Sequence, residues 1–412
     1  MRRQSEGFLP IFAAALLGGA SSAQAAPAFD AQALNRLFDG SSIGGNASGV
    51  PVLGTNAQAI LSEDQGRTLD ALNAALPASA RAWPGYDFLG KPFLAVLKDG
   101  SAILVGHTSP PPNFRPVNYK GRLVYVAANG PDIGFSFKLD YDFAGQKITA
   151  VQADSNSNAS NLVRLAIHER FHDFQHGSPF KTHTGSYLVE EGEDLALAAL
   201  ENRALSDWLK TSAPDAMRDF AAVRMRRRAL FPGTAAEDGQ ENLEGTARYV
   251  DQEAYSAMES PAKSRDELVN ALERPLEFDQ LEKWRLYPVG AVLGRFLQRQ
   301  TPGAWQADVT AGRDLSELVL NRLALGQTEA DSRLVRLTSG PDFARLREEG
   351  RRSVAAVQTR RQDALRRFNA QPGRRILLKA RPGYFSSKGW LSFPDESILF
   401  DPVFASCFAP QA

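Results

Sequence analysis

Residues 168–172 read His-Glu-Arg-Phe-His, so two histidines stand four positions apart with a glutamate directly after the first. On an α-helix this spacing places both imidazoles on one face, where two ring nitrogens can reach one Zn²⁺ ion at about 2.0–2.1 Å. Glu169 would lie beside the open coordination position, where it could take a proton from zinc-bound water and pass it to a leaving amine. The chain has only 5 histidines, so a chance match is rare. The pattern predicts His168 and His172 as metal ligands and Glu169 as general base.

A catalytic zinc site commonly takes three protein ligands, and neither cysteine nor a further histidine suits the third position. Cys407 is the only cysteine, which also excludes an intramolecular disulfide. A longer three-histidine motif would need a histidine six positions after His172, where the chain has Ser178. His176 and His183 are expected to be ordinary histidines of a loop or of the site's surroundings. A glutamate is therefore the natural third ligand.

Three glutamates remain open as that ligand. Glu244 lies on an amphipathic helix, and Gly245 beside it allows a metal site or another backbone to approach closely. Glu201 lies in the apolar stripe of a long helix expected over 186–210, where a buried carboxylate would need a partner. Glu191, near the start of that helix, belongs to an acidic cluster that suits a helix N-terminus. Glu244 is the preferred ligand and Glu201 is the alternative.

The elements around the motif predict short strands before it and mainly helices after it. The motif helix is expected to be capped by Ser160 and to stop before Gly177. Further helices are expected over 62–77 and, rich in arginine, over 341–369. Short β-favouring runs separated by turns fall at 93–97, 102–106, 123–127, 134–141 and 147–151.

Strands first and helices later favour an α+β fold over an alternating α/β one. We expect a zincin-like unit, in which a mostly antiparallel sheet lies against the motif helix and further helices complete a cleft. In such a cleft an edge strand, 147–151, could pair with an extended substrate. The expected parts are a signal peptide (1–25), a poorly ordered lead-in (26–60), a β-rich part (61–159), a helical zinc-site region (160–370) and a β tail (371–412).

The first residues have the features of a secretory signal. Arg2 and Arg3 give a positive start, residues 8–20 are mostly apolar, and Ala-Gln-Ala at 23–25 has the form of a cleavage site. The apolar run is short for a membrane span, although a retained anchor is the alternative. Basic and acidic residues balance at 47 each, which gives no electrostatic reason to expect nucleic acid as a partner. We expect an exported protein, periplasmic or secreted, with no membrane span after signal cleavage.

Two later segments resemble motifs of the aminopeptidase N family of gluzincins. Residues 244–249, Glu-Gly-Thr-Ala-Arg-Tyr, resemble the E-G-x-A-x-Y helix that supplies the third zinc ligand in that family. Residues 287–290, Tyr-Pro-Val-Gly, resemble its Y-x-x-G segment, whose tyrosine stabilises the oxyanion of the tetrahedral intermediate. The resemblance implies a zinc site with His168, His172 and Glu244 as ligands, Glu169 as general base and Tyr287 as oxyanion donor.

The chain also departs from that family. The family's glutamate follows the second histidine after nineteen residues, a spacing that falls on Glu191 here, so Glu244 would require an inserted helical pair within 186–230. The G-x-M-E-N segment that recognises a free N-terminus is absent before His168, so aminopeptidase activity is not implied. The chain is also similar to bacterial proteins with an H-E-x-F-H-x-x-Q motif, matched here through Gln175 and followed by an E-G-x-A-x-Y helix.

Other residues are assigned plain structural roles. Tyr287 has a second interpretation, in which it simply packs at the start of the next helix. The arginine run over 224–228 is expected to be a solvated helix face, with a patch for an acidic substrate tail or a lipid headgroup as the alternative. Arg170 is expected to be a solvated helix position, and Trp284 and Trp390 are expected to be core residues.

Together these features predict an exported zinc-dependent metallohydrolase, a peptidase that cleaves peptide or protein substrates. Two other classes remain open. One is a binding or structural protein with a degenerate site, and the other is a zinc hydrolase of a non-peptide substrate.

Overall fold

The computed structural model describes residues 61–134, 136–155, 157–177, 180, 189, 191–275, 284–370, 390–392 and 398–400. The expected signal peptide (1–25), the lead-in (26–60) and His183 lie outside the described residues. Of the expected β tail the structure describes two short antiparallel strands, β7 (Trp390–Ser392) and β8 (Ile398–Phe400). No helix within the described ranges is long and apolar enough to cross a membrane.

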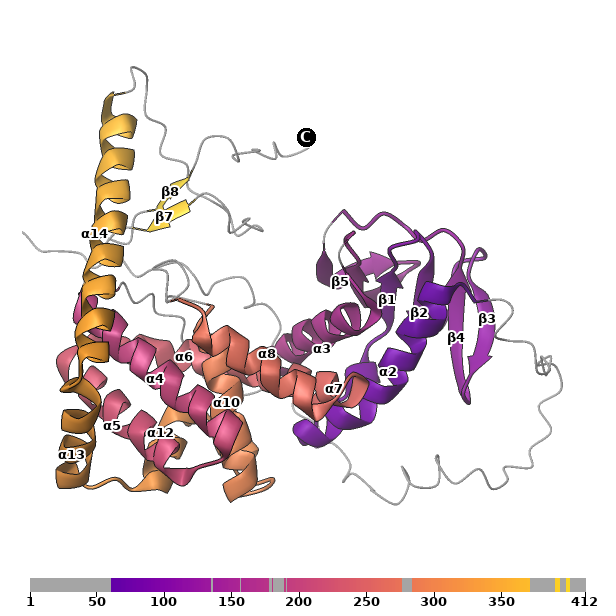
Figure 1. The fold of residues 1–412 in the computed structure, drawn as a ribbon. Coiled ribbons are helices and arrows are strands. Elements are labelled where there is room, and N and C mark those ends of the chain that lie inside the picture. Colours follow the sequence, from indigo (N-terminus) through magenta and orange to yellow (C-terminus); the bar gives the residue numbers. More distant parts are fainter. Residues whose placement is uncertain are drawn as a thin grey trace, which may run out of the picture. The chain divides into compact units, whose positions relative to one another are not determined.

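Six strands form one mixed sheet (Figure 1). Its order is β3-β4-β2-β1-β6-β5, in which β1 and β6 run parallel and all other neighbours run antiparallel. The strands are β1 (Phe93–Val96), β2 (Ala102–Val105), β3 (Arg115–Tyr119), β4 (Arg122–Ala127), β5 (Phe137–Phe143) and β6 (Gln146–Gln152). A strand-rich part followed by helices confirms the expected α+β class, with one parallel pair in a mostly antiparallel sheet.

Two features of the sheet differ from expectation. β3 is missing from the predicted strands because Arg115 and Pro116 are exposed and carry no β signal; a proline is tolerated because β3 is an edge strand. The expectation that 147–151 forms an edge is wrong, because β6 lies between β1 and β5. Residues 148–151 are all buried, which suits a strand covered on both faces. The second edge of the sheet is β5.

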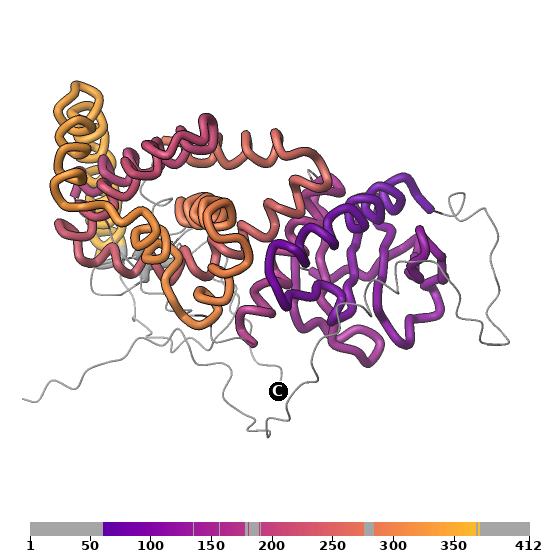
Figure 2. Tube along the Cα trace, turned by 90° about the horizontal axis from the view of Figure 1, so that it is seen from below, coloured from indigo at the N-terminus to yellow at the C-terminus, as the bar shows by residue number. Residues whose placement is uncertain are grey.

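Both faces of the sheet are covered. Along β1, Phe93 and Ala95 pack into a large core shared with the helices, whereas Leu94 and Val96 belong to a smaller core on the opposite face. This alternation follows the two-residue period of a strand. On the helical side, α2 (Glu63–Ala82) packs against both the motif helix and α7 (Thr246–Met258) (Figure 2).

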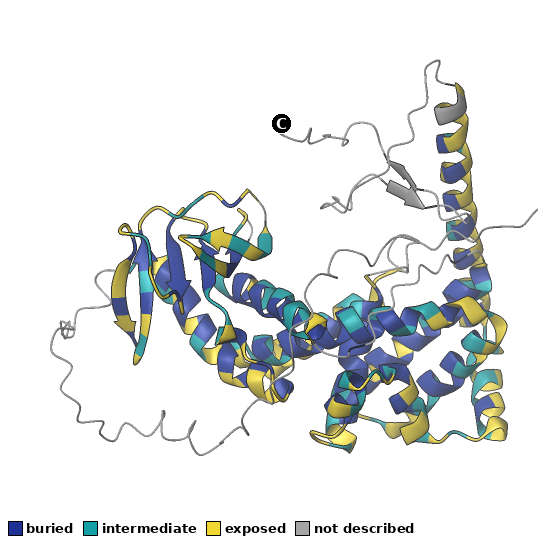
Figure 3. Cartoon of the chain, turned by 180° about the vertical axis from the view of Figure 1, so that it is seen from behind, coloured by how far each residue is buried: buried dark blue, intermediate teal, exposed yellow. Residues whose placement is uncertain are grey.

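Helices make up most of the rest of the described chain. They include α3 (Ala159–His176), α4 (Gly192–Thr211), α5 (Pro214–Leu230), α6 (Glu237–Gln240), the π-helical turn η4 (Glu241–Gly245), α7 (Thr246–Met258), α8 (Pro261–Glu273), α10 (Leu286–Gln300), α11 (Trp305–Thr310), α12 (Leu315–Leu323), α13 (Gln327–Thr338) and α14 (Pro341–Ala370). The long α14 matches the helix expected over 341–369, and Figure 3 shows that it has a buried side and an exposed side.

The motif helix, α3, is capped by a different residue from the one expected. The Asn158 side chain accepts a hydrogen bond at 2.8 Å from the backbone N–H three residues further on, as an N-cap does. Ser160 instead lies inside the first turn, where its hydroxyl donates to Glu259 Oε1 at 2.6 Å. Gly177 follows the last turn, as expected.

Arg170 lies on the side of α3 that faces away from the two histidines. It is buried, so the expectation of a solvated helix position is wrong. Its side chain is buried, Nε donates to the Phe88 carbonyl at 3.4 Å, and the guanidinium pairs with Asp173. Lys91 reaches the same Asp173 carboxylate at 3.2 Å. These contacts hold the helix in place from the side opposite to the histidines.

Candidate metal centre

Three potential ligand atoms converge where α3 meets η4. His168 Nε2 lies 3.1 Å from His172 Nε2 and 3.3 Å from Glu244 Oε2. The third pair, His172 Nε2 and Glu244 Oε2, is 3.2 Å apart. The three side chains are only 9–13% exposed. The structure therefore brings together the two motif histidines and the preferred glutamate as one nearly equilateral triangle of donor atoms.

This triangle has the dimensions of three ligands around one zinc ion. In a tetrahedral site with bonds of about 2.0–2.1 Å, neighbouring donor atoms lie about 3.3–3.4 Å apart. The observed separations of 3.1–3.3 Å are close to that value. Two imidazoles and one carboxylate also form a common donor set of catalytic zinc sites, with the fourth position left for water or substrate. The residues present thus fit a zinc ion in size and in chemistry.

The opposite nitrogen of each ring is held by a hydrogen-bond acceptor. Asp251 Oδ2 lies 2.9 Å from His168 Nδ1, and Gln175 Oε1 lies 2.7 Å from His172 Nδ1. The Gln175 amide nitrogen donates to the Leu243 carbonyl and to a threonine hydroxyl, both at 2.8 Å, so its oxygen must face the ring. Both Nδ1 atoms therefore donate, and in the neutral form of the rings, which is the form that binds metal, the Nε2 lone pairs point at one another and at a carboxylate. A cation between these three donor atoms would stabilise the arrangement.

The electrostatics of the site favour the same conclusion. Burial alone would lower the pKa of His168, but hydrogen bonds with Asp251 and Glu244 outweigh it and raise this pKa to about 9. Burial alone would raise the pKa of Glu244, yet the two histidines hold it well below its usual range. Burial likewise opposes ionisation of Asp251, whose pKa is lowered by Arg248 and His168. Two ionised carboxylates thus attract a cation to the rings.

A close contact between two glycines sets the position of Glu244. A Cβ atom added to Gly245 would lie 2.6 Å from the Cα of Gly290, and one added to Gly290 would lie 2.5 Å from the Cα of Gly245. Only residues without a Cβ allow η4 and α10 to approach so closely. The glycines of the two motif-like segments therefore face each other, and this contact places Glu244 beside Tyr287. A π-helical turn such as η4 frequently occurs at a functional site.

Tyr287 and Glu169 complete the site. The Tyr287 ring stacks on His168, with centroids 5.7 Å apart and planes at 8°, and the side chain lies beside the Glu244 carboxylate. Burial, followed by the Glu244 carboxylate, raises the pKa of this phenol, which keeps it neutral. Glu169 lines the same cavity as the triangle. The cavity measures about 840 Å³, which is large enough for a peptide segment or another small substrate.

The other candidate ligands lie elsewhere. Glu201 is fully buried, and its carboxylate accepts hydrogen bonds from Arg224 at 2.9 and 3.1 Å and pairs with Arg285. It has the partner that a buried carboxylate needs, but this partner is arginine and not metal. Glu191 is the exposed N-cap residue of α4, and His176 is exposed in the last turn of α3. Neither residue contributes to the donor triangle.

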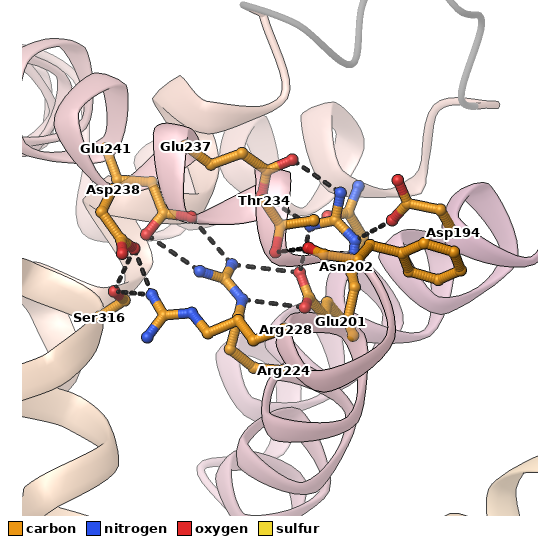
Figure 4. Close-up of polar contacts among 12 residues, drawn as sticks. Asp194, Glu201, Asn202, Arg224, Arg228, Thr234, Glu237, Asp238, Glu241 and Ser316 are labelled. Atoms are coloured by element: carbon orange, nitrogen blue, oxygen red, sulfur yellow. Dashed lines mark hydrogen bonds and ion pairs between the residues drawn. The ribbon is translucent and has the colours of Figure 1, made fainter. Parts of the chain in front are cut away.

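The arginine run on α5 is partly buried, so its expectation as a solvated face is wrong. Arg224 also donates to Glu241 at 2.8 Å (Figure 4), and Arg227 pairs with Glu237 at 2.6 Å. Both arginines are at most 1% exposed. The helix buries them because carboxylates from neighbouring elements neutralise them, and they form no surface patch. The network joins α4 and α5 to η4, which carries the metal-ligand candidate.

Two residues of the site have no functional role in the sequence analysis. Asp251 lies seven positions after Glu244, two turns along the same helical stretch, and this spacing is the signal that could have found it. Trp284 is predicted as core but is 53% exposed and lines the cavity, so that expectation is wrong. Its position three residues before Tyr287 is the corresponding signal. The side chain of Trp390 lies outside the described residues.

Comparison of the chain with known proteins assigns it to no family. The chain matches no protein-family model, and the searches of curated proteins and of solved structures found no match to it. The function must therefore be argued from the geometry of the cavity and its residues.

Proposed function

We propose that this chain is a zinc-dependent metallohydrolase that cleaves peptide bonds. One observation carries the proposal: the donor atoms of His168, His172 and Glu244 form a triangle of zinc-ligand dimensions. The outward nitrogens of both rings are already fixed, as metal-binding histidines require. The triangle borders a cavity that also contains a carboxylate and a phenol suited to hydrolysis.

The chain's own residues would divide the work as follows. A bound zinc ion supplies a Lewis acid that polarises a carbonyl group and lowers the pKa of water. Glu169, next to His168 on the cavity wall, accepts a proton from the attacking water and returns it to the leaving nitrogen. Tyr287 stays protonated and donates a hydrogen bond to the carbonyl oxygen as negative charge develops there. No covalent link between chain and substrate is needed.

A peptide substrate is favoured by the strand beside the cavity. Ser136 and Phe137, at the start of β5, line the cavity wall. Because β5 is an edge strand, the backbone on its outer side can pair with an extended chain. The edge that could bind substrate is thus β5, in place of the strand 147–151 that the sequence suggests.

The likeness to gluzincins is part of the same proposal. The segments that resemble E-G-x-A-x-Y and Y-x-x-G lie next to each other through Gly245 and Gly290, and both border the motif helix. That arrangement supports a zincin-like catalytic unit. We also propose export of the protein, on the signal-like residues at the N-terminus.

Metal content tests the proposal most directly. We would purify the protein without chelator, add zinc, and measure bound metal by mass spectrometry for the wild type, His172→Ala, Glu244→Ala and Glu191→Ala. The expected result is nearly one zinc per chain in the wild type and in Glu191→Ala, and little in the other two. Glu191 is the matched control because it is an exposed glutamate outside the triangle. A wild type that binds no zinc would refute the metal site.

Hydrolysis is tested separately with Glu169→Gln. This variant should keep its zinc and lose cleavage of a mixed peptide library that the wild type cleaves. If the zinc-loaded wild type cleaves no peptide, the chain is a zinc hydrolase of another substrate or a binding protein, and the peptidase proposal fails.

A further inference from the structure

Trp284 has an unusual environment for a tryptophan. Its side chain is 53% exposed, whereas Trp83, Trp208 and Trp305, the other tryptophans with described side chains, are at most 4% exposed. The exposed indole lines the cavity that holds the candidate metal ligands. An exposed indole in a cavity provides a large apolar surface for a ligand.

The indole is connected to the metal site through a stack of rings. The Trp284 ring stacks on Tyr287, with centroids 5.4 Å apart and planes at 30°. Tyr287 in turn stacks on His168. These separations are typical of favourable aromatic pairs. The exposed indole therefore lies two rings away from a metal ligand, close to the bond that would be cleaved.

The two residues between the rings are buried and tied to neighbouring elements. Arg285 and Leu286 are buried, at 3% and 1% exposure. Arg285 Nε donates to Asn202 Oδ1 at 3.0 Å, and its guanidinium pairs with Glu201 and with Glu237. The turn before α10 is thus anchored to the buried network, so that little conformational freedom remains to be lost when the indole binds a ligand.

Two of the arginines that line the cavity are paired with carboxylates. Arg164 pairs with Glu267 at 2.5 Å, and Arg248 pairs with the same carboxylate at 2.7 Å and with Asp251 at 3.2 Å. The apolar members of the cavity wall are Phe137, Leu165, Ala271, Trp284 and Pro288. The surface that these residues offer suits an uncharged, apolar group better than a carboxylate or an ammonium group.

We propose that Trp284 forms a substrate subsite for an aromatic side chain adjacent to the scissile bond. The proposal deepens the peptidase function and rests on it for the nature of the substrate. A flat aromatic ring of the substrate can stack on the Trp284 indole, as Tyr287 stacks on His168. The substrate backbone next to that ring then reaches the metal site. Trp284 is then a specificity-determining residue, and Tyr287 serves the reaction itself.

Binding, measured without cleavage, tests this subsite. We would use zinc-loaded Glu169→Gln protein and titrate a blocked alanine peptide against blocked peptides in which one Phe is moved along the same sequence. At least one Phe peptide should bind about tenfold or more tightly than the alanine peptide, as for other apolar pockets. Trp284→Ala should remove this preference, and Trp284→Phe should keep most of it.

Leu123→Ala provides the matched control, because Leu123 is equally exposed, on β4, and does not line the cavity. It should leave the preference unchanged. Equal binding of all peptides, no binding of any, or a preference that survives Trp284→Ala would each overturn the subsite. Because binding is read without cleavage, a Trp284-dependent preference in a protein that cleaves no peptide would refute the peptidase function and leave the aromatic subsite intact.

Discussion

Asp251 accepts a hydrogen bond from His168 on the side of the ring opposite Nε2. Its Oδ2 atom lies 2.9 Å from the Nδ1 atom of the ring, and both side chains are buried. The two residues are 83 positions apart, so the contact joins α3 to α7. It fixes the ring's orientation and leaves Nε2 directed at Glu244. A carboxylate behind a ligand histidine also raises the basicity of the ring and strengthens its bond to metal.

Asp251→Asn should therefore weaken zinc binding. Loss of the charge behind His168 is expected to lower zinc affinity by about 10–100-fold, measured by competition with a chromogenic chelator. Asp173→Asn is the control, because Asp173 lies on the motif helix but pairs with Lys91 and Arg170. Equal zinc affinity in Asp251→Asn and the wild type would show that Asp251 does not support the ligand.

Gly245→Ala should damage the site through packing. The new methyl group would lie 2.6 Å from the Cα of Gly290, so η4 and α10 must separate. We expect a loss of about 1–3 kcal/mol or more in the free energy of unfolding, together with lower zinc occupancy, because Glu244 moves with η4. Urea unfolding and metal content measure the two effects.

Gly66→Ala is the control for that substitution. Gly66 lies inside α2, and a Cβ atom there would meet nothing within 4 Å. Alanine should stabilise the protein by about 0.5–1 kcal/mol, because it favours the helix. If Gly245→Ala behaves like Gly66→Ala, the close glycine contact does not position Glu244.

The sequence predicts those parts of the site that depend on local geometry. His168 and His172 lie on one helix face because the helical period places them there, and the structure confirms their proximity. The choice among the glutamates needs a contact between distant segments, and the sequence offered only the glycine beside Glu244 and the resemblance as guides. Once Gly245 meets Gly290, Glu244 is the glutamate that reaches the histidines.

The errors in the sequence analysis come from contacts that no local pattern reveals. Arginines are rarely buried unless they are paired, so Arg224 and Arg227 are expected at the surface. One of their partners is Glu201, which precedes Arg224 by 23 positions. The same carboxylate also binds Arg285, which lies 84 positions after it. In the same way, β6 is interior only because it pairs in parallel with β1, across the hairpins between them. Burial of these elements is decided by the assembled fold.

Tyr287→Phe should separate chemistry from structure. The phenylalanine ring can keep its stack on His168, so zinc binding and the free energy of unfolding should change little. Loss of the hydroxyl removes one oxyanion donor, and kcat for peptide cleavage should fall about 10²–10³-fold with little change in KM. Tyr249→Phe is the control, because Tyr249 packs against Trp305 in the core. Unchanged kcat in Tyr287→Phe would leave this tyrosine a packing residue.

The buried ion pairs predict how stability depends on pH. Burial alone would raise the pKa of Glu237, but Arg227 and Arg285 outweigh it and lower this pKa from 4.5 to about 2. Because the folded-state pKa lies below the unfolded one, the ionised carboxylate stabilises the fold above pH 4.5. That contribution is lost as the pH falls toward 2. Glu241 in the same network acts in the opposite sense, because burial outweighs Arg224 and raises its pKa.

Glu237→Gln should therefore lower the free energy of unfolding at pH 7 by about 3–5 kcal/mol, because two buried arginines lose a charged partner. Its stability should also fall less steeply than that of the wild type between pH 4.5 and pH 2, since the titrating group is gone. Urea unfolding at a series of pH values measures both. Glu63→Gln, which replaces an exposed glutamate on α2, should change the free energy of unfolding by no more than about 0.5 kcal/mol. Equal acid sensitivity in Glu237→Gln and the wild type would show that other carboxylates govern acid unfolding.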